Sequence, residues 1–245
     1  MKAWLWFLVC LILLGCGSRP VAPTTDRIQG NVRETLSPLK ERLLRLALQE
    51  WDYFGRQQVI YKDTEESIPH VGIWEDDDLA HSARVNLYWR VVGLPDLNGK
   101  DCQQPWSAAF ISWLMTMAGV PEEDFPPAAA HWGYVSYLIG HHAYNPSARF
   151  VPHTIDCYRP QPGDLICASR GVPAPAWFYP PVQSDLSAPV PMHCDLVIGQ
   201  SGRILQAIGG NVRNAVSESI LTLDSDGHLQ PTPQRPWFIV IENRW

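Results

Sequence analysis

Apolar residues recur at helical spacing in four stretches of the chain. The first stretch begins at Ser37 and Pro38, a helix-capping residue followed by a proline of the first turn, and continues to about residue 54. The second opens with three consecutive acidic residues at 76–78. They could be a metal cluster, but they more strongly favour a helix start, because carboxylates cap an N-terminus and complement the helix dipole. Two further helices are predicted, one over 107–118 and one from about His131.

The pattern changes after about residue 160, where short apolar runs bounded by turn residues predict strands. The predicted strands are 164–168, 193–199, 203–208 and 237–241. Helices followed by antiparallel strands indicate an α+β domain, with N-terminal helices packed on an antiparallel sheet. A segment rich in proline and aromatic residues, 171–190, predicts a long loop that is either functional or an insertion specific to the family.

The first residues have the layout of an export signal. Lys2 precedes an apolar run over 3–14, which is shorter than the roughly 20 residues of a membrane-spanning helix. The run ends in Leu13-Leu14-Gly15-Cys16, which resembles the lipobox of bacterial lipoproteins. The resemblance implies cleavage before Cys16 and acylation of that cysteine. We therefore expect a signal peptide at 1–15, a tether at 16–36 and a single domain at 37–245.

The lipobox also carries an expectation about location. No aspartate follows Cys16, so the resemblance implies the outer membrane of a two-membrane bacterium, with the domain facing the periplasm. Several acyl chains would make this anchorage stable, whereas a single chain gives marginal binding. In such an oxidising compartment, the remaining cysteines could form two disulfides in three possible connectivities. These cysteines are Cys102, Cys157, Cys167 and Cys194.

Composition narrows the classes of partner. With 46% hydrophobic residues the chain is not a disordered segment, and 25 acidic against 19 basic residues give a formal net charge of −6. Nucleic acid is therefore not an expected partner, because phosphate binding needs a basic surface. No cysteine or histidine has the spacing of zinc ligands, so neither a metal nor a cofactor is expected. The 22 prolines predict a loop-rich domain.

Four ordered segments carry the candidate chemistry. They are Trp106-Ser107-Ala108-Ala109-Phe110 at a helix start, Pro162-Gly163-Asp164 before a strand, His193 in the next strand, and Gly210-Asn211 after the third. These segments resemble the CHAP and NlpC-type cysteine amidase-peptidases, papain-like enzymes that cut bacterial cell-wall peptides, over roughly residues 100–216. They resemble more closely an uncharacterised bacterial domain family that carries this pattern with serine in place of the nucleophilic cysteine.

The resemblance implies a role for each matching residue. Ser107 stands in the nucleophile's position, His193 in that of the base, and Asn211 in that of the group that orients the imidazole. Asp195 shares a strand face with His193 and is a rival for the orienting role. A serine hydroxyl cannot form the thiolate of a papain-like site, so it needs full general-base activation. The alternative is that Ser107 is only a helix N-cap.

Neighbouring residues are candidates for substrate binding. Gln103 and Gln104 precede the helix and could donate a hydrogen bond to an oxyanion. Cys102 lies outside the helix start, and Cys194 points away from the face of His193, so neither is expected to replace the nucleophile. The aromatic candidates for lining a cleft are Trp106, Trp113, His131, Trp132 and Tyr134, although a tryptophan at the position of Trp113 more often belongs to the core.

The sequence is compatible with two functions. The first is hydrolysis of amide bonds in cell-wall peptides, as a peptidoglycan amidase or endopeptidase with serine at the usual cysteine position. The second is a catalytically inactive lipoprotein of the same fold, which binds peptidoglycan peptides or a protein partner in the cell envelope.

Overall fold

The structure, a computed structural model, describes residues 36–171 and 189–245. Residues Leu36–Trp245 form one compact unit. The predicted signal peptide, Cys16 and nearly all of the tether lie outside the described residues, as does most of the predicted loop at 171–190. Within the described ranges, no helix combines the length and the apolar character needed to cross a bilayer.

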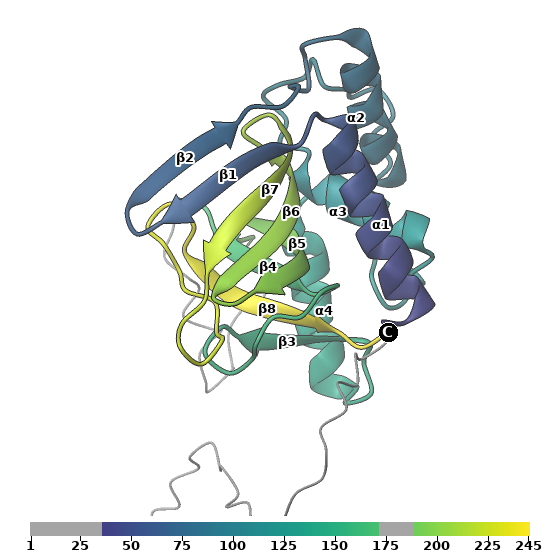
Figure 1. The fold of residues 1–245 in the computed structure, drawn as a ribbon. Coiled ribbons are helices and arrows are strands. Elements are labelled where there is room, and N and C mark those ends of the chain that lie inside the picture. The colour runs from purple at the N-terminus through teal and green to yellow at the C-terminus, as the bar shows by residue number, and fades with distance from the viewer. Residues whose placement is uncertain (1–35, 172–188) are drawn as a thin grey trace, which may run out of the picture. The chain divides into compact units, whose positions relative to one another are not determined.

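The described chain contains four helices and eight strands (Figure 1). The helices are α1 (Pro38–Tyr53), α2 (Leu79–Val91), α3 (Ser107–Ala118) and α4 (His131–Tyr144). The strands are β1 (Gln57–Lys62), β2 (Glu65–His70), β3 (Phe150–Thr154), β4 (Leu165–Ser169), β5 (Met192–Ser201), β6 (Ile204–Val212), β7 (Ala215–Thr222) and β8 (Trp237–Asn243).

All these strands belong to one sheet, in the order β2-β1-β7-β6-β5-β4-β8-β3. Neighbouring strands are antiparallel except β1 and β7, which are parallel. The prediction of an α+β domain is confirmed. The prediction that the sheet is antiparallel throughout is wrong for one pair of strands, β1 and β7. The reason is that the β1–β2 hairpin, which precedes α2 and was not predicted, joins the edge of a sheet built mostly from later strands.

The helix ends follow local capping chemistry. The Ser37 hydroxyl accepts a hydrogen bond from the Lys40 amide at 3.3 Å, and α1 begins one residue after Ser37, as predicted. The Asp78 carboxylate caps α2 by accepting the His81 amide at 2.8 Å. The acidic run at 76–78 is therefore a helix start, and the described residues contain no cluster of three or more metal-ligating side chains.

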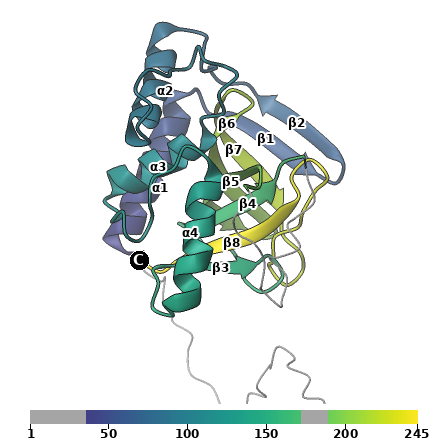
Figure 2. The ribbon, with the colours of Figure 1, turned by 180° about the vertical axis from the view of Figure 1, so that it is seen from behind.

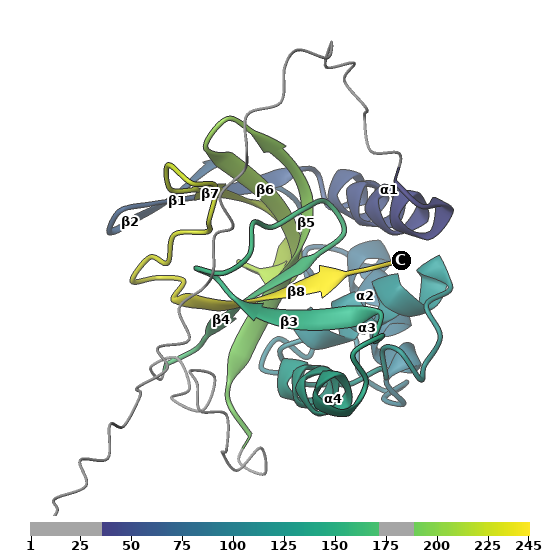
Figure 3. The same cartoon turned by 90° about the horizontal axis from the view of Figure 1, so that it is seen from below.

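The two faces of the sheet are covered differently. Helices α1, α3 and α4 pack on one face, where Leu165 and Leu196 belong to the larger core. On the opposite face the sheet curves around a second core that includes Ile166 and Val197 (Figure 3). Figure 2 shows α4 lying over β3 on the helical side. Because both faces are buried, β4 is buried at every position and reads as a continuous apolar run.

One disulfide joins adjacent strands on the helical side. Cys167 of β4 and Cys194 of β5 pair directly across the sheet, with their Cα atoms 4.1 Å apart, and they are bonded. Cys102 and Cys157 are free thiols. Cys194 is thereby committed to the core under the helices, which agrees with the expectation that it does not act as a nucleophile.

Candidate functional site

The N-terminus of α3 carries the first element of the site. Trp106 is the N-cap residue, its side chain makes no capping hydrogen bond, and Ser107 is the first helical residue. The Ser107 hydroxyl instead lies 2.7 Å from Nε2 of His131 and is 3% exposed. Ser107 is therefore not the N-cap residue of α3, and its oxygen contacts an imidazole from another helix.

The backbone amides at the start of α3 are placed to bind a negatively charged group. The first hydrogen bond within α3 runs from the Phe110 amide to the Trp106 carbonyl, so the amides of Ser107 and Ala108 precede the helical ladder. Both residues border a cavity of about 220 Å³. Unpaired amides and the positive end of a helix dipole can stabilise a developing oxyanion there.

His131, the first residue of α4, connects Ser107 to a buried tyrosine. Its Nδ1 is hydrogen-bonded to the hydroxyl of Tyr134, one helical turn further on. Burial lowers the pKa of His131 well below its usual value, and the charges of His193, Arg170 and Arg235 lower it further. The imidazole of His131 is therefore neutral at neutral pH and can accept a proton.

A second imidazole lies next to the first. Nε2 of His193 is 2.6 Å from Oδ1 of Asp195, whose Oδ2 accepts a hydrogen bond from Ser219 at 2.8 Å. The rings of His193 and His131 meet edge to face, with their centroids 5.4 Å apart. Burial and Arg235 lower the pKa of His193, while Asp195 opposes this effect. Burial works to raise the pKa of Asp195, but His193 and Arg235 hold it below its usual value.

The predicted partnership of His193 with Asn211 is not found. The partner of His193 is Asp195, and no hydrogen bond joins Asn211 to His193 in the part of the chain that the structure describes. Asn211 has a left-handed backbone, with φ of 55°, where the β6–β7 pairing shifts register between Gly209 and Val212. This irregularity places Asn211 at the border of a second, polar cavity.

Two adjacent glycines on β6 allow the site to assemble. A Cβ on Gly209 would lie 1.8 Å from Oδ1 of Asp195, so the carboxylate occupies the space of the missing side chain. A Cβ on Gly210 would lie 2.5 Å from Cβ of Phe110, so α3 packs directly on the backbone of β6. The first glycine makes room for Asp195, and the second sets how closely the helix of Ser107 approaches the sheet.

The predicted binding residues fall in different environments. Trp132 borders the small cavity together with Ser107. Trp106 does not line a cleft: it is 1% exposed, stacks on Tyr88 and donates its indole N–H to Glu75. Its large apolar ring is buried in the core under the helices. Gln104 is exposed and borders neither of the two cavities.

The second cavity has a volume of about 820 Å³ and adjoins the first, since Pro105 and Arg170 border both. Gln103 and Cys102 lie on its wall. Partial desolvation and the nearby carboxylates of Asp76 and Glu75 raise the pKa of the exposed Cys102 thiol. Cys102 is thus poorly suited to replace Ser107 as a nucleophile, in agreement with its position outside α3.

The fold and the site define an α+β domain with a buried serine–imidazole pair at the N-termini of two helices. Residues 76–243 match the family described as uncharacterised proteins conserved in bacteria (DUF2272), and the chain belongs to this family. The match includes Ser107, His131, His193 and Asp195. No curated protein and no solved structure matches the chain significantly.

We predict that Gly209→Ala destabilises the protein by about 1–3 kcal/mol, the usual cost of overpacking a close contact. The added methyl group would displace the Asp195 carboxylate from His193. Gly140→Ala is the matched control, because a Cβ at Gly140 of α4 meets no atom within 4 Å. In urea unfolding, this control should gain roughly 0.5–1 kcal/mol from its better helix propensity. Equal effects of the two substitutions would contradict the prediction.

Proposed function

We propose that the protein hydrolyses amide bonds in bacterial cell-wall peptides, with Ser107 as the nucleophile and His131 as its general base. The observation that carries the proposal is the 2.7 Å contact between the Ser107 hydroxyl and Nε2 of His131 at the positive end of α3. The resemblance to papain-like amidase-peptidases supports it, because those enzymes also place their nucleophile at a helix N-terminus. The base differs from the expected His193.

The proposed reaction begins with the tautomer of His131 in which Nδ1–H donates to the Tyr134 oxygen. Nε2 then takes the Ser107 proton while Oγ attacks the substrate carbonyl, and the α3 amides stabilise the oxyanion. Collapse of the tetrahedral intermediate breaks the C–N bond, and the leaving amine receives the proton from His131. Water, activated by the same imidazole, then hydrolyses the acyl-serine and restores the hydroxyl.

In this scheme His193 and Asp195 act as positioning residues. The His193 ring packs against His131, and its hydrogen bond to Asp195 fixes its orientation. Asp195 carries the negative charge among these buried residues. The pKa of Tyr134 is raised mainly by burial and further by the charge of Asp195. Tyr134 thus stays a neutral phenol that can hold Nδ1 of His131.

The alternative is a non-catalytic protein that binds cell-wall peptides or an envelope partner. The observation in its favour is that the hydrogen bonds of His131 go to two hydroxyls, those of Ser107 and Tyr134. No carboxylate within the described ranges is hydrogen-bonded to His131 to stabilise its protonated form. Catalysis and binding are separated by the activity measurements that follow.

We predict that the wild-type protein releases peptide fragments from purified cell wall and that Ser107→Ala abolishes this release. His131→Ala should lower kcat by roughly 10²–10⁴-fold, the usual contribution of a general base. A serine-directed phosphonate should label the wild type at Ser107, as read by peptide mass. If His193→Ala removes activity and His131→Ala does not, the base is His193. If the wild type neither cleaves nor labels, the hydrolase proposal is refuted, and co-sedimentation with cell wall would then support the binding alternative.

We predict a pH profile shaped by the lowered pKa of His131. Only the neutral imidazole accepts a proton, and burial keeps it neutral below the usual pKa of about 6.5. As the pH falls from 8 to 6.5, kcat should therefore remain nearly constant, and the acidic limb should begin lower. Initial rates on cell-wall peptides across this range provide the measurement, and loss of half the activity at or above pH 6.5 would contradict the assignment.

We also propose that Cys16 anchors the protein to the periplasmic face of the outer membrane, within reach of the cell wall. The lipobox Leu13-Leu14-Gly15-Cys16 supports this location. Radiolabelled palmitate fed to producing cells should label the wild type, and Cys16→Ala should not be labelled. Equal labelling of both proteins, or of neither, would refute the anchor without affecting the hydrolase proposal.

A further inference from the structure

We propose that the polar cavity beside Ser107 binds a carboxylate of an acidic peptide, held by Arg170 and Arg235. This inference deepens the proposed function and rests on it for its link to catalysis. It specifies the substrate class as peptides that carry a free carboxylate near the bond that Ser107 attacks.

The charges on the cavity wall are strongly biased. Among the residues that the structure describes, Arg170, Arg213 and Arg235 border the cavity together with one acidic residue, Glu66. The chain as a whole has a formal net charge of −6, so the positive charge of this cavity is opposite in sign to that of the whole protein. Asn211, with other amide side chains on the wall, adds neutral hydrogen-bond donors. An anion is the ligand that such a lining favours.

Contacts with Tyr61 fix the orientation of the Arg235 side chain. Its Nε donates to the Tyr61 hydroxyl at 3.0 Å, and its guanidinium lies 5.2 Å from the centroid of the Tyr61 ring. Tyr61 is 1% exposed and belongs to the second core, so this support is rigid. The terminal nitrogens of Arg235 make no hydrogen bond to the residues that the structure describes. A planar guanidinium fixed in this way is suited to donate hydrogen bonds to both oxygens of a carboxylate.

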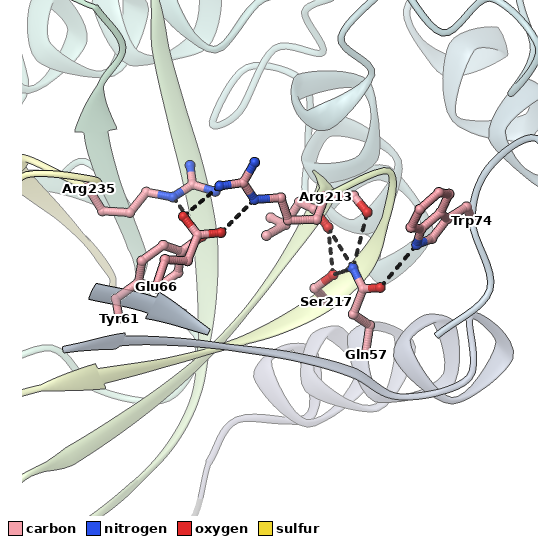
Figure 4. Close-up of polar contacts among 8 residues, drawn as sticks. Gln57, Tyr61, Glu66, Trp74, Arg213, Ser217 and Arg235 are labelled. Carbon is pink, nitrogen blue, oxygen red and sulfur yellow. Dashed lines mark hydrogen bonds and ion pairs between the residues drawn. The ribbon is translucent and has the colours of Figure 1, made fainter. Parts of the chain in front are cut away.

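Arg213 has a different role. Its Nε and a terminal nitrogen bind the two oxygens of Glu66 at 2.5 and 2.7 Å. Figure 4 shows its guanidinium beside that of Arg235, with Glu66 next to both. Glu66 therefore offsets one of the three positive charges, and two remain. The uncompensated charge is carried by Arg235 and by Arg170, which forms no ion pair within the described ranges.

The position of Arg170 connects the two cavities. It borders both the polar cavity and the small cavity at Ser107. Arg170 and Arg235 also lower the pKa of both His131 and His193. The two arginines are therefore close enough to the serine–imidazole pair to act on it electrostatically. A ligand carboxylate between these arginines would thus lie close to the carbonyl presented to Ser107.

A further observation points to an occupant. Ser169 borders the cavity, the residue is 3% exposed, and its buried hydroxyl has no hydrogen-bond partner among the described residues. Buried hydroxyls are normally paired, so an unpaired hydroxyl in a residue of this wall is unusual. The volume of about 820 Å³ exceeds what a lone inorganic anion fills, which favours a carboxylate carried by a peptide.

The test measures binding separately from hydrolysis. The probe is acetylated alanyl-glutamyl-alanine, titrated calorimetrically into the full chain at low salt. The neutral control is the same peptide with glutamine and a C-terminal amide. We expect the acidic peptide to bind and the neutral one to bind at least about tenfold more weakly, as for the loss of a charge-assisted hydrogen bond. Ser107→Ala should bind the acidic peptide as well as the wild type does.

Matched variants assign the binding to the cavity. Arg235→Gln and Arg170→Gln should each weaken binding of the acidic peptide by about tenfold. Arg45→Gln changes the net charge equally on the exposed side of α1 and should leave binding unchanged. Inorganic phosphate should compete only weakly.

Three results would overturn the inference: equal binding of the two peptides, equal losses in Arg45→Gln and Arg235→Gln, or tight phosphate binding that the acidic peptide does not displace. Arginine-dependent binding without hydrolysis would support the carboxylate site and refute the proposed function alone.

Discussion

The close approach of α3 to β6 is the constraint on which the site depends. At Gly210 no side chain separates the strand from Phe110, so the helix rests on the strand backbone. This contact fixes the N-terminus of α3 and with it Ser107. The neighbouring Gly209 leaves space for the carboxylate of Asp195. A larger residue at either glycine would have to push apart the helix and the sheet or displace Asp195.

The polar groups at this junction are buried, and their pairing determines their charge states. Two imidazoles with lowered pKa values lie beside one carboxylate, and arginines from the adjoining cavity add positive charge. This arrangement keeps His131 neutral while it contacts Ser107. A chain with an acidic net charge can thus have a basic cavity, because three arginines border it and Glu66 offsets only one of them.

Local signals were sufficient to predict the helices and several strands. Ser37 and Pro38 identify the start of α1, and the predicted bounds of α3 agree with the structure. The β1–β2 hairpin was missed because β2 is largely exposed and has no continuous apolar run. Its parallel pairing with β7 joins segments far apart in the sequence, and no local pattern encodes that contact.

Only part of the candidate site could be predicted from the sequence. The motif order identified Ser107 and His193, and the period of the strand put Asp195 on the same face as His193. The contact of His131 with Ser107 was not foreseen, because it depends on how two helix N-termini meet in space. The spacing of His131 and Tyr134, one helical turn apart, was the available signal for that pair. The prediction that Trp106 lines a cleft was wrong, because a tryptophan beside a motif can be buried in the core as readily as it can line a cleft.

The most direct test of the central claim, that α3 and His131 activate the side chain at position 107, is the alkylation rate of Ser107→Cys. The substitution is made together with Cys102→Ala and Cys157→Ala, so that the exposed thiols do not compete. The new thiol should react at pH 6–7 faster than a free thiol of pKa about 8.5, and adding His131→Ala should slow it. A thiol that reacts no faster than a free one, whether or not His131 is present, would contradict the claim.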